Sequence, residues 1–214
     1  MKVVLLGPPG AGKGSLAGLL KEKYSLVHIS TGDMLREEIK KGTPLGVEIK
    51  ALITKGVLVS DELVTKLVEQ RIQNDPEVKK GYMFDGYPRT VKQAQDLDEI
   101  LAKAHAPLDF ALDMEADHNL LLKRLTGRRV CRKCGALFHM TNKPPVKAGV
   151  CDACGGELYQ RSDDNEETIK ERMHVYEVST APIIEFYSKQ HKLKKLDANV
   201  DTHELCDSLA TMFK

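Results

Sequence analysis

The sequence predicts an α/β fold, in which short buried strands alternate with helices. Three observations predict it: short apolar runs, glycine and capping residues between them, and a glycine-rich turn after the first run. The apolar runs, interpreted as buried strands of a parallel sheet, cover residues 3–6, 26–29, 81–85, 108–112 and 193–196. The turn leads into a helix that ends at Tyr24, so the chain opens with a strand, a turn and a helix.

Cap residues and helix breakers predict where the other helices begin and end. Ser60 is expected to cap the helix that follows it, and Asp164, with Glu167 three residues later, to cap a long helix. Pro182 should kink or end that long helix, and the last helix should run to the C-terminus. Further helices are expected after Ser30, from Thr43 to Lys55 and from Asp117 to Thr126.

Composition favours an ordinary globular protein. The 214 residues are enough for one large domain, or a core with small insertions, and 42% are hydrophobic while 29% are charged. The formal net charge of +1 argues against a generic nucleic-acid coat. No apolar run approaches the ~18 residues of a membrane span, and the apolar N-terminal run is too short for a secretory signal. We therefore expect a cytoplasmic protein with reduced cysteines and no membrane partner.

The glycine-rich turn has the residues of a phosphate-binding loop. It reads Gly-Pro-Pro-Gly-Ala-Gly-Lys-Gly-Ser over residues 7–15. Its glycines let backbone N–H groups point inward, the helix start adds a positive dipole end, and Lys13 adds a charge for the terminal phosphates. A hydroxyl that binds Mg²⁺ usually follows the lysine directly, whereas here Gly14 does and Ser15 comes next. We therefore expect Mg²⁺ to be held mainly through phosphates, water and carboxylates such as Asp85, at a strand end.

Three segments resemble signatures of one enzyme family. The glycine-rich turn resembles the loop of nucleoside monophosphate kinases. Residues 28–36, His-Ile-Ser-Thr-Gly-Asp-Met-Leu-Arg, resemble the start of the monophosphate-binding segment of adenylate kinases. Residues 85–90, Asp-Gly-Tyr-Pro-Arg-Thr, differ from that family's Asp-Gly-Phe-Pro-Arg-Thr only at Tyr87. The resemblance runs from Gly7 to the loop near Val200, and it departs from the family's Gly-x-Leu-Val-Pro at Ser60, which replaces the proline.

This resemblance implies a particular architecture. The expected fold is the P-loop nucleoside monophosphate kinase fold: a five-stranded parallel sheet with helices on both faces, plus a helical flap and a zinc-bearing lid. The core would comprise residues 1–29, 60–126 and 165–214. The flap, residues 30–59, would bind AMP, and the lid would be residues 127–164 with its zinc ribbon.

The resemblance also implies an activity. It is the reversible, Mg²⁺-dependent transfer of a phosphoryl group from ATP to AMP, which yields ADP and serves adenine nucleotide homeostasis. Small nucleotides would be the partners, with no nucleic acid and no membrane, and the family suggests a monomer. The acceptor phosphate is already an oxyanion, so the reaction needs charge neutralisation and in-line positioning more than a general base.

Matching positions assign roles to residues of this chain. Thr31 and Gln93 would contact the acceptor base, Arg36 and Arg89 its phosphate, and Asp163 would orient an arginine. The implied catalytic residues are Lys13, Asp85, Arg89, Arg124, Arg128, Arg161, Asp163 and Arg172. The implied ATP contacts are Gly10, Ala11, Gly12, Lys13, Gly14, Ser15, Arg124, Arg128 and Val200. The implied AMP contacts are Thr31, Arg36, Val57, Leu58, Val59, Gly86, Tyr87, Pro88, Arg89, Gln93, Arg161 and Arg172.

The arginines also have a simpler interpretation. Arg124 and Arg128 are four residues apart near a predicted helix end, so we expect them on one helix face. Each could be a solvated surface charge, as could Arg36 on its helix and Arg89 on its loop.

Four cysteines form the clearest metal pattern in the chain. Cys131 and Cys134 form one Cys-x-x-Cys pair and Cys151 and Cys154 another, at the spacing of a zinc site. Four thiolates can close a tetrahedron around structural Zn²⁺, or iron in its place. Disulfides are the competing interpretation, although they conflict with a cytoplasmic chain. His139 is a weak further ligand candidate, and Cys206 is expected to be a buried residue of the last helix.

Two other functions stay open on the sequence alone. The first is a kinase for a monophosphate with another base, such as GMP or UMP. It stays open because only a few residues indicate which base the acceptor carries. The second is a zinc-ribbon module that binds nucleic acid and uses ATP as a switch. Lys and Arg outnumber Asp and Glu between residues 128 and 161, which would suit an RNA backbone, but there is no set of stacking aromatic residues there.

Overall fold

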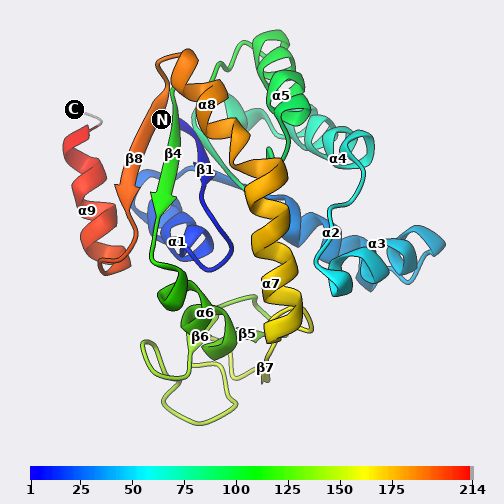
Figure 1. Cartoon of the computed structure of the whole chain (residues 1–214), viewed down its shortest axis with the longest axis vertical. Helices are drawn as coiled ribbons and strands as arrows, with labels where there is room; N and C mark the ends of the chain where they lie inside the picture. The colour runs from blue at the N-terminus through cyan, green and yellow to red at the C-terminus, as the bar shows by residue number, and fades with distance from the viewer. Residues whose placement is uncertain (213–214) are drawn as a thin grey trace.

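A five-stranded parallel sheet forms the centre of the molecule (Figure 1). The computed structural model describes residues 1–212 and gives the strand order β2-β3-β1-β4-β8. The strands are β1 (Lys2–Leu6), β2 (Val27–Ser30), β3 (Tyr82–Asp85), β4 (Phe110–Glu115) and β8 (Leu193–Asp197). The predicted class and its five strands are therefore confirmed. Strand β4 begins and ends later than predicted, because its pairing with β8 continues to Glu115 opposite Asp197.

Alternation along β1 divides the core into two parts. Val4 and Leu6 pack on one face of the sheet with α4, α5 and α8, whereas Val3 and Leu5 pack on the other with α1, α6, α7 and α9. Each of these four side chains is at most 3% exposed, so strands covered on both faces appear as continuous apolar runs. The helices of the core are α1 (Lys13–Tyr24), α4 (Asp61–Asn74), α5 (Val91–Lys103), α6 (His118–Gly127), α7 (Glu166–Val175), α8 (Pro182–Lys189) and α9 (Thr202–Met212), with a short 3₁₀ turn at Pro76–Lys79.

Two helix ends differ from prediction in detail. Ser60 occupies the N-cap position of α4, but its side chain makes no capping hydrogen bond. Helix α9 is described as far as Met212, and the last two residues of the predicted C-terminal helix lie outside the described residues. Cys206 is buried in this helix at 4% exposure, as predicted. No helix within residues 1–212 combines the length and apolarity needed to cross a membrane.

Residues 30–59 form an arm of two helices that projects from the core (Figure 1). These are α2 (Thr31–Lys40) and α3 (Pro44–Lys55). Ser30 and Thr43 cap them through their side chains, which accept from Asp33 N and Gly46 N. The two helices pack closely at Gly46, where an added Cβ would lie 2.5 Å from the Glu38 carbonyl oxygen.

Residues 127–164 form a second projection, which contains its own small sheet. Three short antiparallel strands have the order β6-β5-β7: β5 (Arg128–Cys131), β6 (Leu137–His139) and β7 (Leu158–Tyr159). The expectation that Arg124 and Arg128 share a helix face is wrong. Helix α6 ends at Gly127 and Arg128 has an extended backbone (φ −65°, ψ 138°), because it pairs with His139 in the sheet.

The long helix near the C-terminus is capped and interrupted differently from prediction. Asn165, rather than Asp164, caps α7 by accepting from Thr168 N. Asp164 is instead fully buried and is held by arginines, so a tertiary ion pair outweighs the local capping pattern. A π-helical turn (Tyr176–Thr180) follows α7, and Pro182 starts α8 just beyond it, in agreement with the predicted break.

Candidate active site

One large cavity of about 1430 Å³ lies between the core, the two-helix arm and the second projection. It opens at the carboxyl ends of β1 and β3, where ligands bind in open α/β sheets. Almost all the site residues predicted above line it. The exceptions among the predicted nucleotide contacts are Ala11, Tyr87 and Val200. Tyr87 points into the core at 0% exposure, with its hydroxyl bonded to Thr65 and to the Gln93 carbonyl oxygen.

The glycine-rich turn follows β1 and wraps closely against its neighbours. A Cβ on Gly7 (φ 130°) would lie 2.6 Å from the Met114 carbonyl oxygen, and one on Gly10 (φ 88°) would lie 2.8 Å from that of Leu121. Only glycine fits such positions, where the backbone is left-handed and a neighbouring chain is close. Helix α1 then begins at Lys13, which places a helix N-terminus at the turn.

Lys13 and Asp85 form the charged centre of the cavity floor. Lys13 Nζ donates to the carbonyl oxygens of Gly7 (2.7 Å) and Pro8 (2.9 Å). Burial lowers the pKa of Lys13 to about 8, although Asp85 opposes the shift. Burial raises the pKa of Asp85, but His28 and Lys13 outweigh it and hold that pKa below its ordinary value. Asp85 is therefore an ionised carboxylate at the end of β3, 3.6 Å from His28 Nε2.

Several arginines line the rest of the cavity, and the side chains of Arg128, Arg161 and Arg172 are half-buried there. Burial, together with Arg128 and Arg36, lowers the pKa of Arg161 to about 10, and its buried Nε atom has no hydrogen-bond partner among residues 1–212. The Arg89 side chain is exposed overall, but desolvation within the cavity and the neighbouring Arg172 lower its pKa as well. Guanidinium groups that repel one another in a buried site form a binding site for anions of high charge.

Two aspartates of the second projection hold Arg128, from the same projection, and Arg172, from α7. Asp164 accepts from Arg128 Nε at 2.8 Å and Arg128 Nη2 at 2.5 Å, and also from Arg172 Nη1 at 3.3 Å. Asp163 lies 2.9 Å from Arg172 Nη1, as predicted for a carboxylate that orients an arginine. Asp164 was missed as a site residue because its sequence pattern suggested a helix cap.

The second projection rests on the glycine-rich turn. Leu137 Cδ1 lies 3.4 Å from where a Cβ on Gly14 would stand, and Asp85 Oδ2 lies 3.5 Å from the same point. His139 anchors this arrangement: its Nε2 bonds the Lys123 carbonyl oxygen at 3.1 Å, and its Nδ1 accepts from Thr141 N and Asn142 N. His139 is thus a structural contact and not a fifth metal ligand. Leu137 does not stand out in the sequence as a site residue, and His139 was considered there only as a weak metal ligand.

The two-helix arm forms the other end of the cavity. Thr31 and Gln93 are buried there, at 3% and 2% exposure, and the backbone segment 57–59 lies alongside. Arg36 Nη2 contacts Asp33 Oδ1 at 2.6 Å. The π-helical turn also reaches this end, since Thr180 Oγ1 donates to the Arg89 carbonyl oxygen at 2.9 Å. No sequence pattern indicated that contact.

Arg124 marks the opposite end of the cavity, beside the glycine-rich turn. Its Nη1 donates to the Ala198 carbonyl oxygen at 2.8 Å and lies 3.5 Å from that of Ala11. It therefore joins the turn to the loop after β8, whose next residues, 201–203, line the cavity. The sequence pointed to Val200 in this loop and missed residues 201–203.

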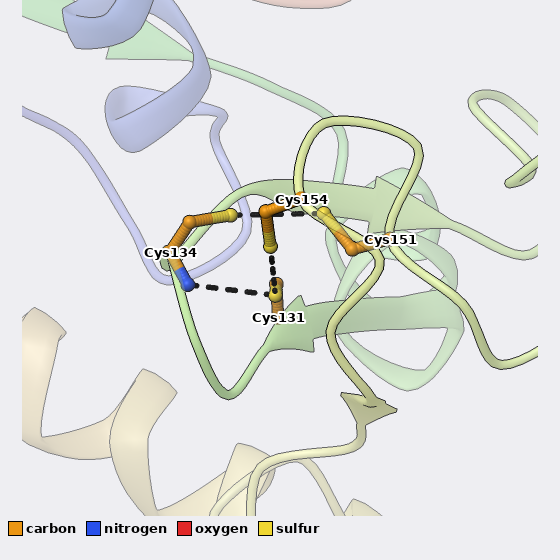
Figure 2. A group of neighbouring side chains, drawn as sticks. All are labelled: Cys131, Cys134, Cys151 and Cys154. Carbon is orange, nitrogen blue, oxygen red and sulfur yellow. Dashed lines mark hydrogen bonds between the residues drawn. The ribbon is translucent and has the colours of Figure 1, made fainter.

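The four cysteines of the second projection converge on one point (Figure 2). Cys131 and Cys154 Sγ are 3.5 Å apart and Cys134 and Cys151 Sγ 3.6 Å, while all four sulfurs lie within 4.8 Å of one another. A tetrahedron of Zn–S bonds of about 2.3 Å has edges of about 3.8 Å, so the set fits a tetrahedral ion. Lys133 N and Cys134 N donate to Cys131 Sγ, as expected for a metal-binding turn. The cysteines are free, so the disulfide alternative is not supported.

Fold and site together define a class of protein. A glycine-rich turn with a lysine at the head of a parallel sheet, enclosed by two projections that carry arginines, is the arrangement of a P-loop nucleoside monophosphate kinase.

Comparison with known proteins gives the family. The family model described as adenylate kinase matches residues 5–192. The chain is 53% identical over 197 residues to an adenylate kinase of Syntrophobacter fumaroxidans, with 92% of each chain covered. It is 48% identical over 209 residues to one of Carboxydothermus hydrogenoformans, with 98% of this chain and 97% of the relative covered. The chain belongs to the adenylate kinase family, and is thus a phosphotransferase.

Proposed function

We propose that this protein catalyses the reversible transfer of a phosphoryl group from ATP to AMP, with ADP as the product. The observation that carries the proposal is the convergence of Lys13 and five arginines on one cavity beside an ionised Asp85. These five are Arg36, Arg89, Arg128, Arg161 and Arg172. Family membership and the named relatives support the same activity and do not favour the two alternatives raised by the sequence.

The cavity suits two nucleotides that meet at their phosphates. We assign ATP to the end that holds the glycine-rich turn and Arg124, and AMP to the end that holds Thr31 and Gln93. Arg89 then binds the acceptor phosphate, while Lys13 and the arginines of the second projection neutralise the transferring group. No residue has to abstract a proton, since the acceptor oxygen is already ionised at neutral pH. Arginines fixed by Asp163 and Asp164 reduce the cost of positioning during the reaction.

Asp85 fits a role in holding Mg²⁺. Its carboxylate is ionised and lies near Gly14, directly over the turn that would hold the donor phosphates. Mg²⁺ bound with ATP would supply charge neutralisation and would hold the phosphate oxygens in a defined geometry. Ser15 lines the same cavity but follows Gly14, so phosphates and water would complete the ion's coordination.

For the cysteine cluster we propose one structural Zn²⁺ per chain. Four thiolates leave no coordination position for water or substrate, so the ion would stabilise the fold without taking part in the chemistry. The segment has little core of its own: Phe138 and Leu158 pack against two of the cysteines, while Met140 and Val146 are exposed. A metal cross-link would therefore replace the missing hydrophobic core.

We further propose the division of labour that the family resemblance implies. Residues 30–59 act as an AMP-binding flap, residues 127–164 as a lid over ATP, and the remaining segments as the core. The lid would exclude water, which would otherwise compete with AMP as the acceptor. A cytoplasmic location agrees with the unpaired cysteines, and a monomeric state can be tested by sedimentation.

The test is a coupled assay of ADP formation with ATP and each of AMP, GMP, UMP and CMP. We expect AMP to give by far the highest kcat/KM. A comparable value for GMP or UMP would contradict the acceptor assignment. A filter-binding titration with RNA addresses the remaining alternative, and tight RNA binding without ADP formation would contradict the proposal altogether.

A further inference from the structure

A chain of hydrogen bonds leads from the proposed acceptor-base site to Asp61. Gln93, 2% exposed in the first turn of α5, is bonded at both ends of its amide. Its Oε1 accepts from Arg89 N at 2.8 Å, and its Nε2 donates to Asp61 Oδ1 at 2.8 Å. Asp61 is the first residue of α4, so two helices and the acceptor loop meet at this one amide.

These two partners fix which way the Gln93 amide points. A backbone N–H can only donate and an ionised carboxylate can only accept, so the amide oxygen must face Arg89 and the amide nitrogen must face Asp61. A flipped amide would place two N–H groups together at one end and two oxygens together at the other. Nε2 carries a second N–H, for which residues 1–212 provide no acceptor. The fixed orientation therefore leaves one N–H of Gln93 Nε2 to donate to a ligand, at an atom where a flipped amide would have an oxygen.

Thr31 has the opposite polarity. Its hydroxyl has a single proton, which it donates to the Gly86 carbonyl oxygen at 2.8 Å. Thr31 is 3% exposed and lines the same cavity as Gln93. Toward a ligand, Thr31 therefore offers only the lone pairs of its oxygen.

We propose that Asp61 is a positioning residue that sets the selectivity for the acceptor base, an inference that rests on the proposed function. One acceptor and one donor match a 6-aminopurine, which offers the N–H of its amino group and a bare ring nitrogen beside it. A 6-oxopurine carries an oxygen in place of the amino group and a hydrogen on N1. Thr31 would then face an acceptor, and Gln93 a donor at N1. A 6-oxopurine would therefore bind weakly, because its polar groups would not match those of Thr31 and Gln93. Asp61 does not contact the base itself but keeps the Gln93 amide in the orientation that causes this mismatch.

A change in selectivity on replacing Asp61 could also have a purely structural cause, because this residue supports the start of α5 as well. Asp61 Oδ2 accepts from Thr90 Oγ1 at 2.7 Å, and Thr90 caps α5 by accepting from Gln93 N at 3.1 Å. The neighbouring Glu62 lies in the same first turn of α4 and is exposed. Thr90 and Glu62 therefore provide controls for the cap and for the charge at the helix start.

The experiment compares kcat/KM for AMP and GMP in the wild type, Asp61→Ala, Thr90→Val and Glu62→Ala. In Asp61→Ala, where the amide is free to turn, we expect the preference for AMP over GMP to narrow by about tenfold or more, mainly through the KM for AMP. The KM for ATP should stay unchanged. Thr90→Val should lower the melting temperature but leave the preference for AMP over GMP at the wild-type value. Glu62→Ala should leave both the melting temperature and the preference at their wild-type values. An unchanged preference in a folded Asp61→Ala would overturn the inference.

A charge-conserving exchange covers the case in which Asp61→Ala does not fold. In the double variant Asp61→Asn with Gln93→Glu, the new amide can donate to the new carboxylate, which then faces the base as an acceptor. We expect GMP to gain on AMP relative to the wild type, and an unaltered ratio would overturn the inference. If the wild type and all variants prefer AMP over GMP equally, the inference about Asp61 is wrong but the proposed function is not contradicted. A wild type that forms no ADP from AMP would contradict the proposed function and the inference with it.

Discussion

At the residue scale, Lys13 has a charge that depends strongly on what occupies the cavity. Its ammonium group donates to two carbonyl oxygens, and burial lowers its pKa from 10.5 to about 8. Below pH 8 the group is protonated, and above pH 8 it is increasingly neutral. Phosphate oxygens favour the charged form, so nucleotide binding should raise this pKa again.

This shift predicts proton uptake when ATP binds. At pH 8 about half of the free protein has a neutral Lys13, so binding should take up about half a proton, and at pH 6.5 almost none. Calorimetry in buffers of different ionisation enthalpy measures the number directly. Lys13→Met provides the control, because it should abolish the uptake at pH 8. Equal uptake in the wild type and in that variant would assign the proton to another group.

At the element scale, the strands could be predicted because burial on both faces of a sheet requires a continuous apolar run. Most helix starts could be predicted because a side chain such as Thr43 caps its own helix within three residues. Arg128 and Asp164 were misjudged because their ion pair joins positions 36 residues apart and no local pattern records it. The lid sheet was missed for a related reason: β6 and β7 are only three and two residues long.

Two helical glycines with different surroundings should respond oppositely to substitution by alanine: Gly46, packed between α2 and α3, and Gly18 in α1. Gly46→Ala would place a Cβ against the Glu38 backbone, so we expect a loss of about 1–3 kcal/mol in the free energy of unfolding. Gly18 lies inside α1, and apart from its chain neighbours and its own helix backbone no atom of residues 1–212 lies within 4 Å of where its Cβ would stand. Gly18→Ala should therefore raise the stability by about 0.4–1 kcal/mol. Urea unfolding monitored by circular dichroism measures both, and similar effects from the two changes would contradict this account of the packing.

At the scale of the whole molecule, the site is assembled from all three segments. The residues around the central sheet provide Lys13 and Arg89, the two-helix arm provides Thr31 and Arg36, and the second projection provides Arg128 and Arg161. Most of these residues could be predicted from their motifs in the sequence. Contacts between residues far apart in the sequence could not be predicted, such as Leu137 against the glycine-rich turn and Thr180 on Arg89. They depend on how the segments pack, and single side chains with no motif make them.

The proposed zinc site belongs to this scale because a bound ion would cross-link the two Cys-x-x-Cys turns of the second projection. Cys151→Ser, or removal of the metal by a chelator, should lower the melting temperature clearly, while activity well below the transition should fall much less. A chelator should shift the melting temperature of the wild type but hardly that of Cys151→Ser. Calorimetric scans and turnover at low temperature measure the two effects. A loss of turnover as deep as that of Lys13→Met, in a folded metal-free protein, would mean that the ion takes part in the chemistry.

The central claim is that the lysine and arginine side chains of one cavity bind the phosphates during transfer of a phosphoryl group to AMP. Its most direct test is the rate of ADP formation by Arg89→Met, with circular dichroism to establish that the variant is folded. Lys92→Met serves as the matched control, since Lys92 is three residues away and pairs with Asp96 at the surface. We expect Arg89→Met to lower kcat/KM for AMP by about a thousandfold or more and Lys92→Met to leave it unchanged. Near-normal activity of Arg89→Met with AMP would contradict the account.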